Sequence, residues 1–308
     1  MGRRKKGQPI SGWVIIDKPK GMSSSQVVGK VKWLLDAQKA GHGGTLDPLA
    51  TGILPIALGE ATKTVSFVMD GAKIYRCWVR FGASTTTDDA EGEIVERSDV
   101  RPTAADIQAV LAEFEGDITQ IPPVYSAIKI DGKRAYKRAR ADEDVEMPSR
   151  VVRIDSVKLI EMLEPDLAVI DVHCGKGTYI RALARDLAVR LGTQGHVFDL
   201  RRLQAGPFNE SHAISLDSLE TLRHSAPVNE VVLPIMTALD DIPELALTEV
   251  EAGKMRQGMP VPAVTVLKRT PDLQVAFGQT VMAMDGNTPV ALARIDGGEI
   301  RSVRVLNL

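Results

Sequence analysis

Cysteines and histidines are scarce in this sequence. Its 308 residues include two cysteines, Cys77 and Cys174, and five scattered histidines. Two cysteines so far apart give neither a disulfide framework nor a C-x-x-C metal site, and H-E-x-x-H does not occur. The sequence therefore argues against a catalytic metal, and we predict chemistry that needs none.

Long apolar runs are also missing. No apolar stretch reaches about 18 residues, the length that would suggest a membrane span. The basic opening M-G-R-R-K-K-G-Q-P lacks the apolar stretch that a signal peptide requires. We therefore predict a cytoplasmic protein without a membrane partner. The 44% apolar and 25% charged fractions are those of an ordinary globular protein, and the length suggests one large and one small domain.

The motifs of several nucleotide-dependent and hydrolytic enzymes do not occur either. G-K-G-T-Y-I at 175 to 180 begins like a dinucleotide-binding loop, but Ile180 stands where the third glycine belongs. G-E-A-T-K at 59 to 63 lacks Walker spacing, and no G-x-S-x-G motif is present. The chemistry must come from other side chains, and we predict no cofactor.

Charge of one sign is scarce in particular segments, although the net charge is only −2. Basic residues outnumber acids by nine to two in residues 1 to 40, six to one in 129 to 140, and six to two in 176 to 202. Residues 209 to 251 hold nine acids and one Arg. This segregation suits a phosphate-binding face, although any single run could be an ordinary solvated surface.

What the sequence does have is a segment rich in glycine around one acid, at residues 41 to 63. It reads G-H-G-G-T-L-D-P-L-A-T-G-I-L-P-I-A-L-G-E-A-T-K. Its glycines permit positive φ and close backbone approach, while Pro48 confines Asp47 to extended or turn geometry. The apolar residues that follow would anchor the loop in a core. A carboxylate fixed in this way suits a nucleophile, although an Asp before Pro also often just closes a turn.

The pattern H-x-G-T-L-D-P-x-A-x-G-x-L, followed by G-E-A-T-K, resembles the signature of the TruB family of tRNA pseudouridine synthases. Further matching motifs, in the family's order, are D-K-P-K-G-M-S-S, K-I-Y-R, Q-I-P-P-V-Y-S-A, G-K-G-T-Y-I-R and L-R-R-L, so the resemblance covers about residues 11 to 210. It implies an isomerase that converts uridine to pseudouridine at position 55 in the T-arm of tRNA, with no obligatory protein partner. A guide-RNA-dependent subunit and a non-catalytic tRNA-binding or folding factor are the alternatives.

The resemblance also implies a set of site residues. Asp47 matches the nucleophile, and Tyr75 and Arg181 complete the catalytic set. The expected substrate contacts are His42, Tyr75, Tyr179, Leu200, Lys18 and Lys63. An adjacent guanidinium lowers a carboxylate pKa, so Arg181 would offset desolvation and orient Asp47, which attacks either C6 of the base or C1′ of the sugar.

Tyr75 offers an aromatic face for uracil, and its hydroxyl could take the C5 proton; the alternative is a core aromatic. The target base must be flipped out of an RNA loop, and His42 could stack in the vacated space. One motif departs from the family. The loop after the Tyr75 strand commonly reads T-D-T but here reads T-T-T at 85 to 87, so Thr86 replaces an acid. We expect a lost contact near the site without lost activity, because Asp88 and Asp89 remain nearby.

The element pattern predicts an α+β fold with a mixed, mainly antiparallel sheet. Predicted strands are 11 to 19, 72 to 82, two within 151 to 174, and 195 to 208; predicted helices are 27 to 36, 104 to 114, about 178 to 191, and 248 to 257. We expect a basic tail at 1 to 10, a catalytic domain at 11 to 245, and a small β-rich domain at 246 to 308, which resembles the PUA-like domain of bacterial TruB enzymes.

Residues 121 to 150 are predicted to form a protruding lobe that binds RNA. The segment leaves the body through I-P-P-V-Y-S-A and continues into a helix on which bases and then acids follow one another. We expect its basic side chains to contact phosphates: Lys133, Arg134, Lys137 and Arg138. The alternative is a surface helix held by local ion pairs, which contribute little stability.

Overall fold

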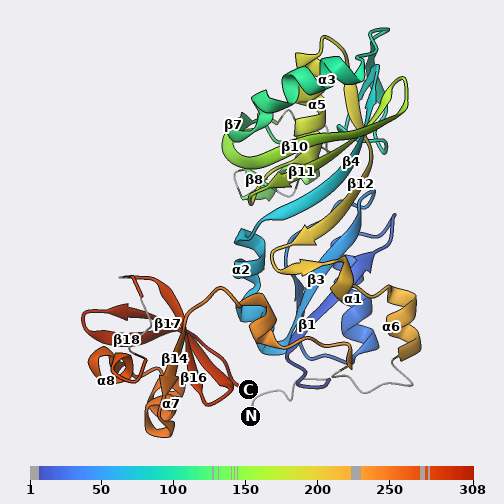
Figure 1. The fold of residues 1–308 in the computed structure, drawn as a ribbon. Coiled ribbons are helices and arrows are strands. Elements are labelled where there is room, and N and C mark those ends of the chain that lie inside the picture. The colour runs from blue at the N-terminus through green and yellow to red at the C-terminus, as the bar shows by residue number, and fades with distance from the viewer. Residues whose placement is uncertain are drawn as a thin grey trace.

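The computed structural model describes residues 7–126, 128–130, 132–139, 141, 143, 145–222, 230–270, 275–276 and 278–308. The described residues form one large mixed sheet and one separate small sheet, both with helices, so the predicted α+β class is confirmed (Figure 1). Two further sheets have two strands each, and one of them pairs β5 (Ala83–Thr85) with β6 (Ile94–Arg97). Over these described ranges, every helix is too short or too polar to cross a membrane.

The large sheet runs in the order β1-β3-β12-β4-β11-β10-β7, and the short strands β2 and β13 pair with β3 and β12. Its strands are β1 (Gly12–Lys18), β2 (Ala40–His42), β3 (Thr51–Leu58), β4 (Lys73–Phe81), β7 (Gly116–Gln120), β10 (Arg150–Glu164), β11 (Leu167–Cys174), β12 (Gly195–Ala205) and β13 (Phe208–Asn209). β12 runs parallel to β3, whereas the other paired strands of this sheet are antiparallel. The predicted mixed, mainly antiparallel sheet is therefore confirmed.

The helices of the large domain begin where the sequence places caps. α1 (Ser24–Leu34) starts after Ser23, and α3 (Ala104–Leu111) starts after Thr103; both caps form reciprocal hydrogen bonds with the residue three positions on. α5 (Ile180–Arg190) packs its buried leucines against β12, while α2 (Val65–Asp70) and α6 (Leu216–Leu222) are shorter. The helices α3 and α5 lie on the same end of the sheet (Figure 1).

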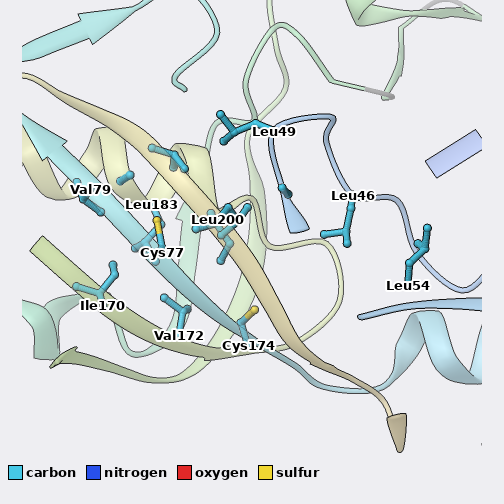
Figure 2. Close-up of a cluster of buried hydrophobic side chains, with 14 of the residues drawn as sticks. Leu46, Leu49, Leu54, Cys77, Val79, Ile170, Val172, Cys174, Leu183 and Leu200 are labelled. Atoms are coloured by element: carbon cyan, nitrogen blue, oxygen red, sulfur yellow. The ribbon is translucent and has the colours of Figure 1, made fainter. Parts of the chain in front are cut away.

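One apolar core joins the centre of the sheet to the segment around Asp47. Leu46 and Leu49 of that segment are 4% and 5% exposed. They belong to the same cluster as Cys77 of β4 and Leu200 of β12, and Figure 2 shows these side chains together. The segment is therefore anchored in the core, as its sequence predicts.

The small sheet forms a second, β-rich domain with its own core. Its order is β14-β16-β17-β18-β15, from β14 (Glu244–Leu247), β15 (Val261–Pro262), β16 (Thr280–Asp285), β17 (Thr288–Asp296) and β18 (Glu299–Val305), with helices α7 (Glu249–Arg256) and α8 (Ala263–Leu267). Thr248 and Glu251 form a capping box at the start of α7, where the sequence predicts a helix. The domain boundary at 246 stays a prediction, and the first strand of the small sheet, β14, begins two residues before it, at Glu244. Of the basic tail predicted at 1 to 10, residues 1–6 lie outside the described residues.

The segment between β7 and β10 leaves and re-enters the same sheet edge, since these two strands pair antiparallel. It contains β8 (Lys129–Ile130), β9 (Lys133–Arg134) and α4 (Ala135–Ala139). The predicted helix is present as α4, and Lys133 and Arg134 lie on the strand before it. A small core of Ala135, Val145 and Met147 holds the segment together. We call residues 121 to 150 the lobe; its binding of RNA stays a prediction.

Candidate active site

Asp47 lies in a loop between β2 and β3 that is pinned from two sides. The Ser24 hydroxyl accepts from the amide of Leu46 at 2.8 Å and donates to its carbonyl at 2.9 Å. Gly44 has φ +130°, a conformation that side-chain-bearing residues rarely adopt. The amide of Ala50 donates to the carbonyl of Asp47, which closes the turn at Pro48. The backbone of Asp47 is therefore held stiffly.

Arg202 of β12 also holds this loop in place through hydrogen bonds. Its side chain is 1% exposed, and its guanidinium donates to the carbonyls of Ile53, Gly44 and Thr45 at 2.7, 3.2 and 3.4 Å. Its neighbour Arg201 points to the opposite face of the strand and pairs with Asp17. The motif L-R-R-L contains both residues, but only the alternation of strand side chains could have indicated that one of them is buried.

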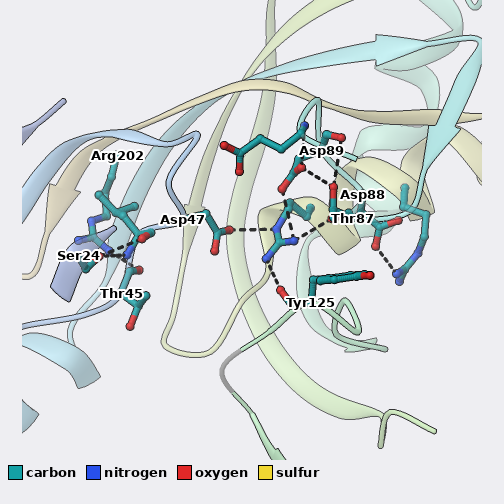
Figure 3. Close-up of polar contacts among 12 residues, drawn as sticks. Ser24, Thr45, Asp47, Thr87, Asp88, Asp89, Tyr125 and Arg202 are labelled. Carbon is teal, nitrogen blue, oxygen red and sulfur yellow. Dashed lines mark hydrogen bonds and ion pairs between the residues drawn. The ribbon is translucent and has the colours of Figure 1, made fainter. Parts of the chain in front are cut away.

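The structure brings Asp47 and Arg181 together. Nε of Arg181 lies 3.0 Å from Oδ2 of Asp47, and its Nη1 lies 3.4 Å from Oδ2 of Asp89 (Figure 3). The same guanidinium donates to the carbonyls of Thr87 and Tyr125 at 2.7 and 2.9 Å. Arg181 sits in the first turn of α5, so a helix, a turn and the lobe fix its position.

Burial raises the pKa of Asp47 above its ordinary value, and the negative charge of Asp89 adds to this. Arg181 and, more weakly, Lys18 oppose the rise in pKa. The sequence led us to expect that Arg181 would offset desolvation; in the structure desolvation remains the larger effect. A carboxylate with a raised pKa is a stronger nucleophile once ionised.

Tyr75 of β4 lies directly across the strand pair from Arg202. Burial raises the pKa of its hydroxyl, while the nearby Arg202 guanidinium acts in the opposite direction. The hydroxyl is therefore protonated at neutral pH. This favours Tyr75 as an aromatic face and a proton donor, and its acceptance of the C5 proton stays a prediction.

Two hollows meet at Asp47. The first has a volume of about 270 Å³ and the second about 550 Å³. The first is lined by Asp47, Tyr75, Tyr179, Leu200, Arg181, Arg202, Lys73 and Arg150, among others. The second is lined by Asp47, His42, Ser23, Thr87, Asp89, Glu91, Tyr125, Lys129, Arg134 and others. The predicted set thus divides: Tyr75, Tyr179 and Leu200 share the first hollow, whereas His42 lies in the second.

The two predicted lysines lie outside both hollows. Lys18 is fully buried and donates to the carbonyls of Pro19, Met22 and Pro48. Burial lowers its pKa to about 8. Lys63 binds Glu60 at 2.5 Å and the carbonyl of Val305 in the small domain at 2.7 Å. Both ammonium groups hold protein segments together in this structure, and their contact with substrate stays a prediction.

Sequence reasoning missed the contact that fixes Tyr179. Gln120 is fully buried, accepts from the amide of Tyr179 at 3.1 Å and donates to its carbonyl at 3.3 Å.

Sequence reasoning also missed the partners of the acids near Thr86. Asp89 is 3% exposed and faces Arg181, while Asp88 pairs with Arg185 at 2.9 Å. The Thr86 hydroxyl accepts from the amide of Glu93, and the amide of Thr86 donates to the carbonyl of Glu93, so both bonds stay within the turn. The acids that remain therefore make the contacts to α5.

The predicted phosphate contacts gather in a hollow of the lobe. It has a volume of about 530 Å³ and is lined by Lys129, Gly132, Lys133, Arg134, Lys137, Arg138 and Glu143. Arg134 also lines the second hollow at Asp47, so the basic surface of the lobe reaches the candidate active site. Phosphate binding by these residues stays a prediction.

Family models and curated proteins match this chain over most or all of its length. Residues 32–180 match the TruB family pseudouridylate synthase N-terminal domain, and residues 181–240 match the tRNA pseudouridylate synthase B C-terminal domain. The chain is 53% identical to a tRNA pseudouridine synthase B of Rhodospirillum rubrum and 49% identical to that of Caulobacter vibrioides, over all of both chains in each case.

Two solved structures share the fold. A Cbf5-Nop10-Gar1 complex is similar with a TM-score of 0.72 and 25% identity, over 96% of this chain and 85% of that chain. An H/ACA ribonucleoprotein bound to a substrate RNA containing 2′-deoxyuridine is similar with a TM-score of 0.73 and 22% identity, over 100% and 92%.

Proposed function

Because the chain belongs to the TruB family of pseudouridylate synthases, we propose that it isomerises uridine to pseudouridine at position 55 in the T-arm of tRNA. The observation that carries this proposal is the 3.0 Å ion pair of Asp47 and Arg181 at the edge of a hollow lined by Tyr75, Tyr179 and Leu200. A tRNA substrate also supports the cytoplasmic location that the sequence predicts.

The reaction breaks the bond between N1 and C1′, turns the base, and joins C5 to C1′. The proton of C5 leaves, and N1 gains one, so the isomerisation involves no redox change and no net hydrolysis. Asp47 adds to the substrate, at C6 of the base or at C1′ of the sugar, and is released again. Arg181 holds the carboxylate toward the hollow and opposes the rise in its pKa that burial causes.

The surroundings favour negative charge on the detached base. Lys73, Arg150, Arg181 and Arg202 line the same hollow as Asp47. Such fixed cations stabilise charge that develops during the reaction, because they are already oriented when it forms. Tyr75 and Tyr179 provide aromatic surfaces for the base.

The target uridine enters this hollow by leaving the stack of its RNA loop, which costs a few kcal/mol. His42 and the second hollow lie on the side where the rest of the loop would remain. His42 is partly buried, and its pKa is lowered by burial, so it stays neutral and can stack. The lobe would hold phosphates of the T-arm.

Two alternatives remain. A guide-RNA-dependent subunit is suggested by the fold shared with the H/ACA structure, but the full-length relatives at about half identity carry the name of a tRNA enzyme. A non-catalytic tRNA-binding or folding factor would not need the arrangement of Asp47, Tyr75 and Arg181. We therefore favour an enzyme that needs no obligatory protein partner.

One experiment separates these readings. Purified protein is mixed with an unmodified T-arm transcript, without metal or partner, and the RNA is analysed for pseudouridine. Product at a single uridine supports the proposed function. Binding without product supports the folding factor, and product that forms only after a guide RNA and partner proteins are added supports the subunit.

A further inference from the structure

Arg150 is the first residue of β10 and lies at the root of the lobe, where it lines the hollow that contains Asp47. Its guanidinium carbon stands 4.5 Å from the centre of the Tyr179 ring. Its Nε and Nη2 atoms are shielded from solvent and have no hydrogen-bond partner among the described residues. Arg150 thus carries two unused donors beside the proposed uracil pocket.

Other arginines of this protein show what the same two atoms normally do. Nε and Nη2 of Arg76 bind the two oxygens of Asp171, both at 2.8 Å. The same edge of Arg190 binds both oxygens of Glu113 at 2.7 Å. This edge of a guanidinium is a fork that fits an oxyanion with two available oxygens. In Arg150 the fork has no such partner within the part of the chain that the structure describes.

The lining of the hollow offers no acid for this fork. Of the described residues that line it, Asp47 is the one carboxylate, and Arg181 already pairs with it. The other cations have partners: Lys73 donates to the carbonyl of Gly71, and Arg202 donates to three carbonyls. A shielded charged donor without a partner is costly, so an incoming oxyanion that reaches Arg150 is favoured.

We propose that the Nε and Nη2 fork of Arg150 binds the phosphodiester group on one side of the flipped uridine. This inference rests on the proposed function and adds a substrate contact to those predicted for Lys133, Arg134, Lys137 and Arg138. A phosphodiester offers two free oxygens to the fork, whereas each uracil carbonyl offers one. Because the guanidinium also packs on Tyr179, whose backbone Gln120 clamps, the contact ties the strand to the wall of the base pocket.

The backbone opposite Arg150 leaves room for such a strand. Gly175 and Gly177 line the same hollow, and Gly177 has φ +82°. A Cβ atom at Gly177 would come within 3.9 Å of Nη1 of Arg150. The turn therefore presents bare backbone beside the guanidinium, as expected where a ligand backbone approaches closely.

The test pairs a protein change with an RNA change. T-arm stem-loops carry one uncharged methylphosphonate, either directly 5′ or directly 3′ of the target uridine, and affinity is measured for the wild type and Arg150→Met. We expect one of the two linkages to lower wild-type affinity by about 10- to 100-fold, the range for one charge-assisted contact. Arg150→Met should lower affinity similarly, and the combination should lower it no further. Additive losses at both linkages would overturn the proposal.

Two variants keep the test decisive. Arg150→Lys keeps the charge but lacks the fork, so we expect it to recover only part of the affinity. Arg153→Met, on the same strand, removes an exposed arginine that pairs with Asp155. This variant should bind the unmodified stem-loop and each methylphosphonate stem-loop with the affinity of the wild type. An equal loss in Arg153→Met would indicate a general effect of charge and contradict a specific contact.

The outcome is distinguishable from failure of the proposed function. Wild-type turnover on the unmodified stem-loop tests the function alone, whereas the affinity cycle does not depend on turnover. If the wild type forms pseudouridine but the affinity losses caused by Arg150→Met and by the methylphosphonate are additive, the proposed function is supported and the proposed role of Arg150 is wrong.

Discussion

Two cation-rich surfaces lie side by side in this molecule, and they hold their charges in opposite ways. Around Asp47 the cations are buried and bonded to backbone carbonyls, as in Arg202 and Lys18. In the lobe, Lys133 and Arg134 are exposed on a short strand. A buried, bonded cation can fix a reacting group, whereas an exposed one mainly adds long-range attraction. The comparison predicts that changes to Asp47 and to the bonded cations around it affect the rate, and that changes to the exposed cations of the lobe affect binding.

The largest effect is expected for Asp47→Asn. The amide keeps the size of the side chain but cannot act as the nucleophile, so turnover should fall by roughly a thousandfold or more. RNA affinity should stay within a few-fold, because the lobe and the walls of both hollows are unchanged. Single-turnover rates and equilibrium binding measure the two quantities. A variant with a normal rate would remove Asp47 from the mechanism.

The next effect comes from the two adjacent arginines of β12, which test the comparison within one strand. Arg202→Lys places one ammonium where a guanidinium spans the carbonyls of Gly44, Thr45 and Ile53. We expect the loop of Asp47 to loosen, kcat to fall by about 100-fold, and the free energy of unfolding to drop by about 3 kcal/mol.

Arg201→Lys is the matched control, because Arg201 points away from Asp47 and pairs with Asp17 and Glu210 near the surface. Its kcat should be close to that of the wild type. Equal losses of kcat in both variants would show that the strand, and not the buried guanidinium, governs the position of the loop.

The same contrast shows what could be predicted from the sequence. Helix starts at Ser23, Thr103 and Thr248 were predictable, because a cap depends on residues three positions apart. The insertion of β12 between β3 and β4 was not, because it depends on pairing between distant segments. The family resemblance pointed to Asp47 and Arg181, and the structure places them in contact.

Other parts of the site needed coordinates. Asp89 pairs with Arg181, and Arg202 donates to the loop of Asp47; in both cases the partner is distant in sequence. No sequence motif specifies either contact. Arg150 could not be found from any motif, since its distinguishing property is that its Nε and Nη2 atoms have no hydrogen-bond partner among the described residues. For Lys63 the family pattern suggested a substrate contact, but in the structure its ammonium binds Glu60 and the carbonyl of Val305 in the small domain.

In the lobe we expect a smaller effect, and one on binding alone. Replacing Lys133, Arg134, Lys137 and Arg138 by glutamine should weaken RNA affinity by roughly tenfold or more and flatten its salt dependence by about 0.7 to 0.9 per lost phosphate contact. At saturating RNA, kcat should change little. Lys158→Gln, an exposed change on the body of β10, is the control. An unchanged salt slope would place the phosphate-binding face elsewhere.

A shift in pH dependence would sharpen the account of Asp47. The raised pKa means that the ionised, reactive form is lost at a higher pH than for an ordinary Asp as the pH falls. Asp89→Asn removes a negative charge that contributes to this rise, so the pKa of Asp47 should decrease and the acid limb of the rate profile should move to lower pH. Asp88→Asn, whose charge pairs with Arg185, should leave the limb in place. An acid limb that moves upward in Asp89→Asn would contradict this electrostatic account.

The smallest effect is expected where the chain departs from its family. Thr86→Asp restores the usual acid, but Asp89 already faces Arg181, and Asp88 already holds Arg185. A carboxylate at position 86 can also still accept from the amide of Glu93, as the Thr86 hydroxyl does. We therefore expect kcat within about twofold and stability within about 0.5 kcal/mol of the wild type. A tenfold rise in kcat would mean that the missing acid contributes to the reaction, and that the buried contacts around Arg181 are incomplete without it.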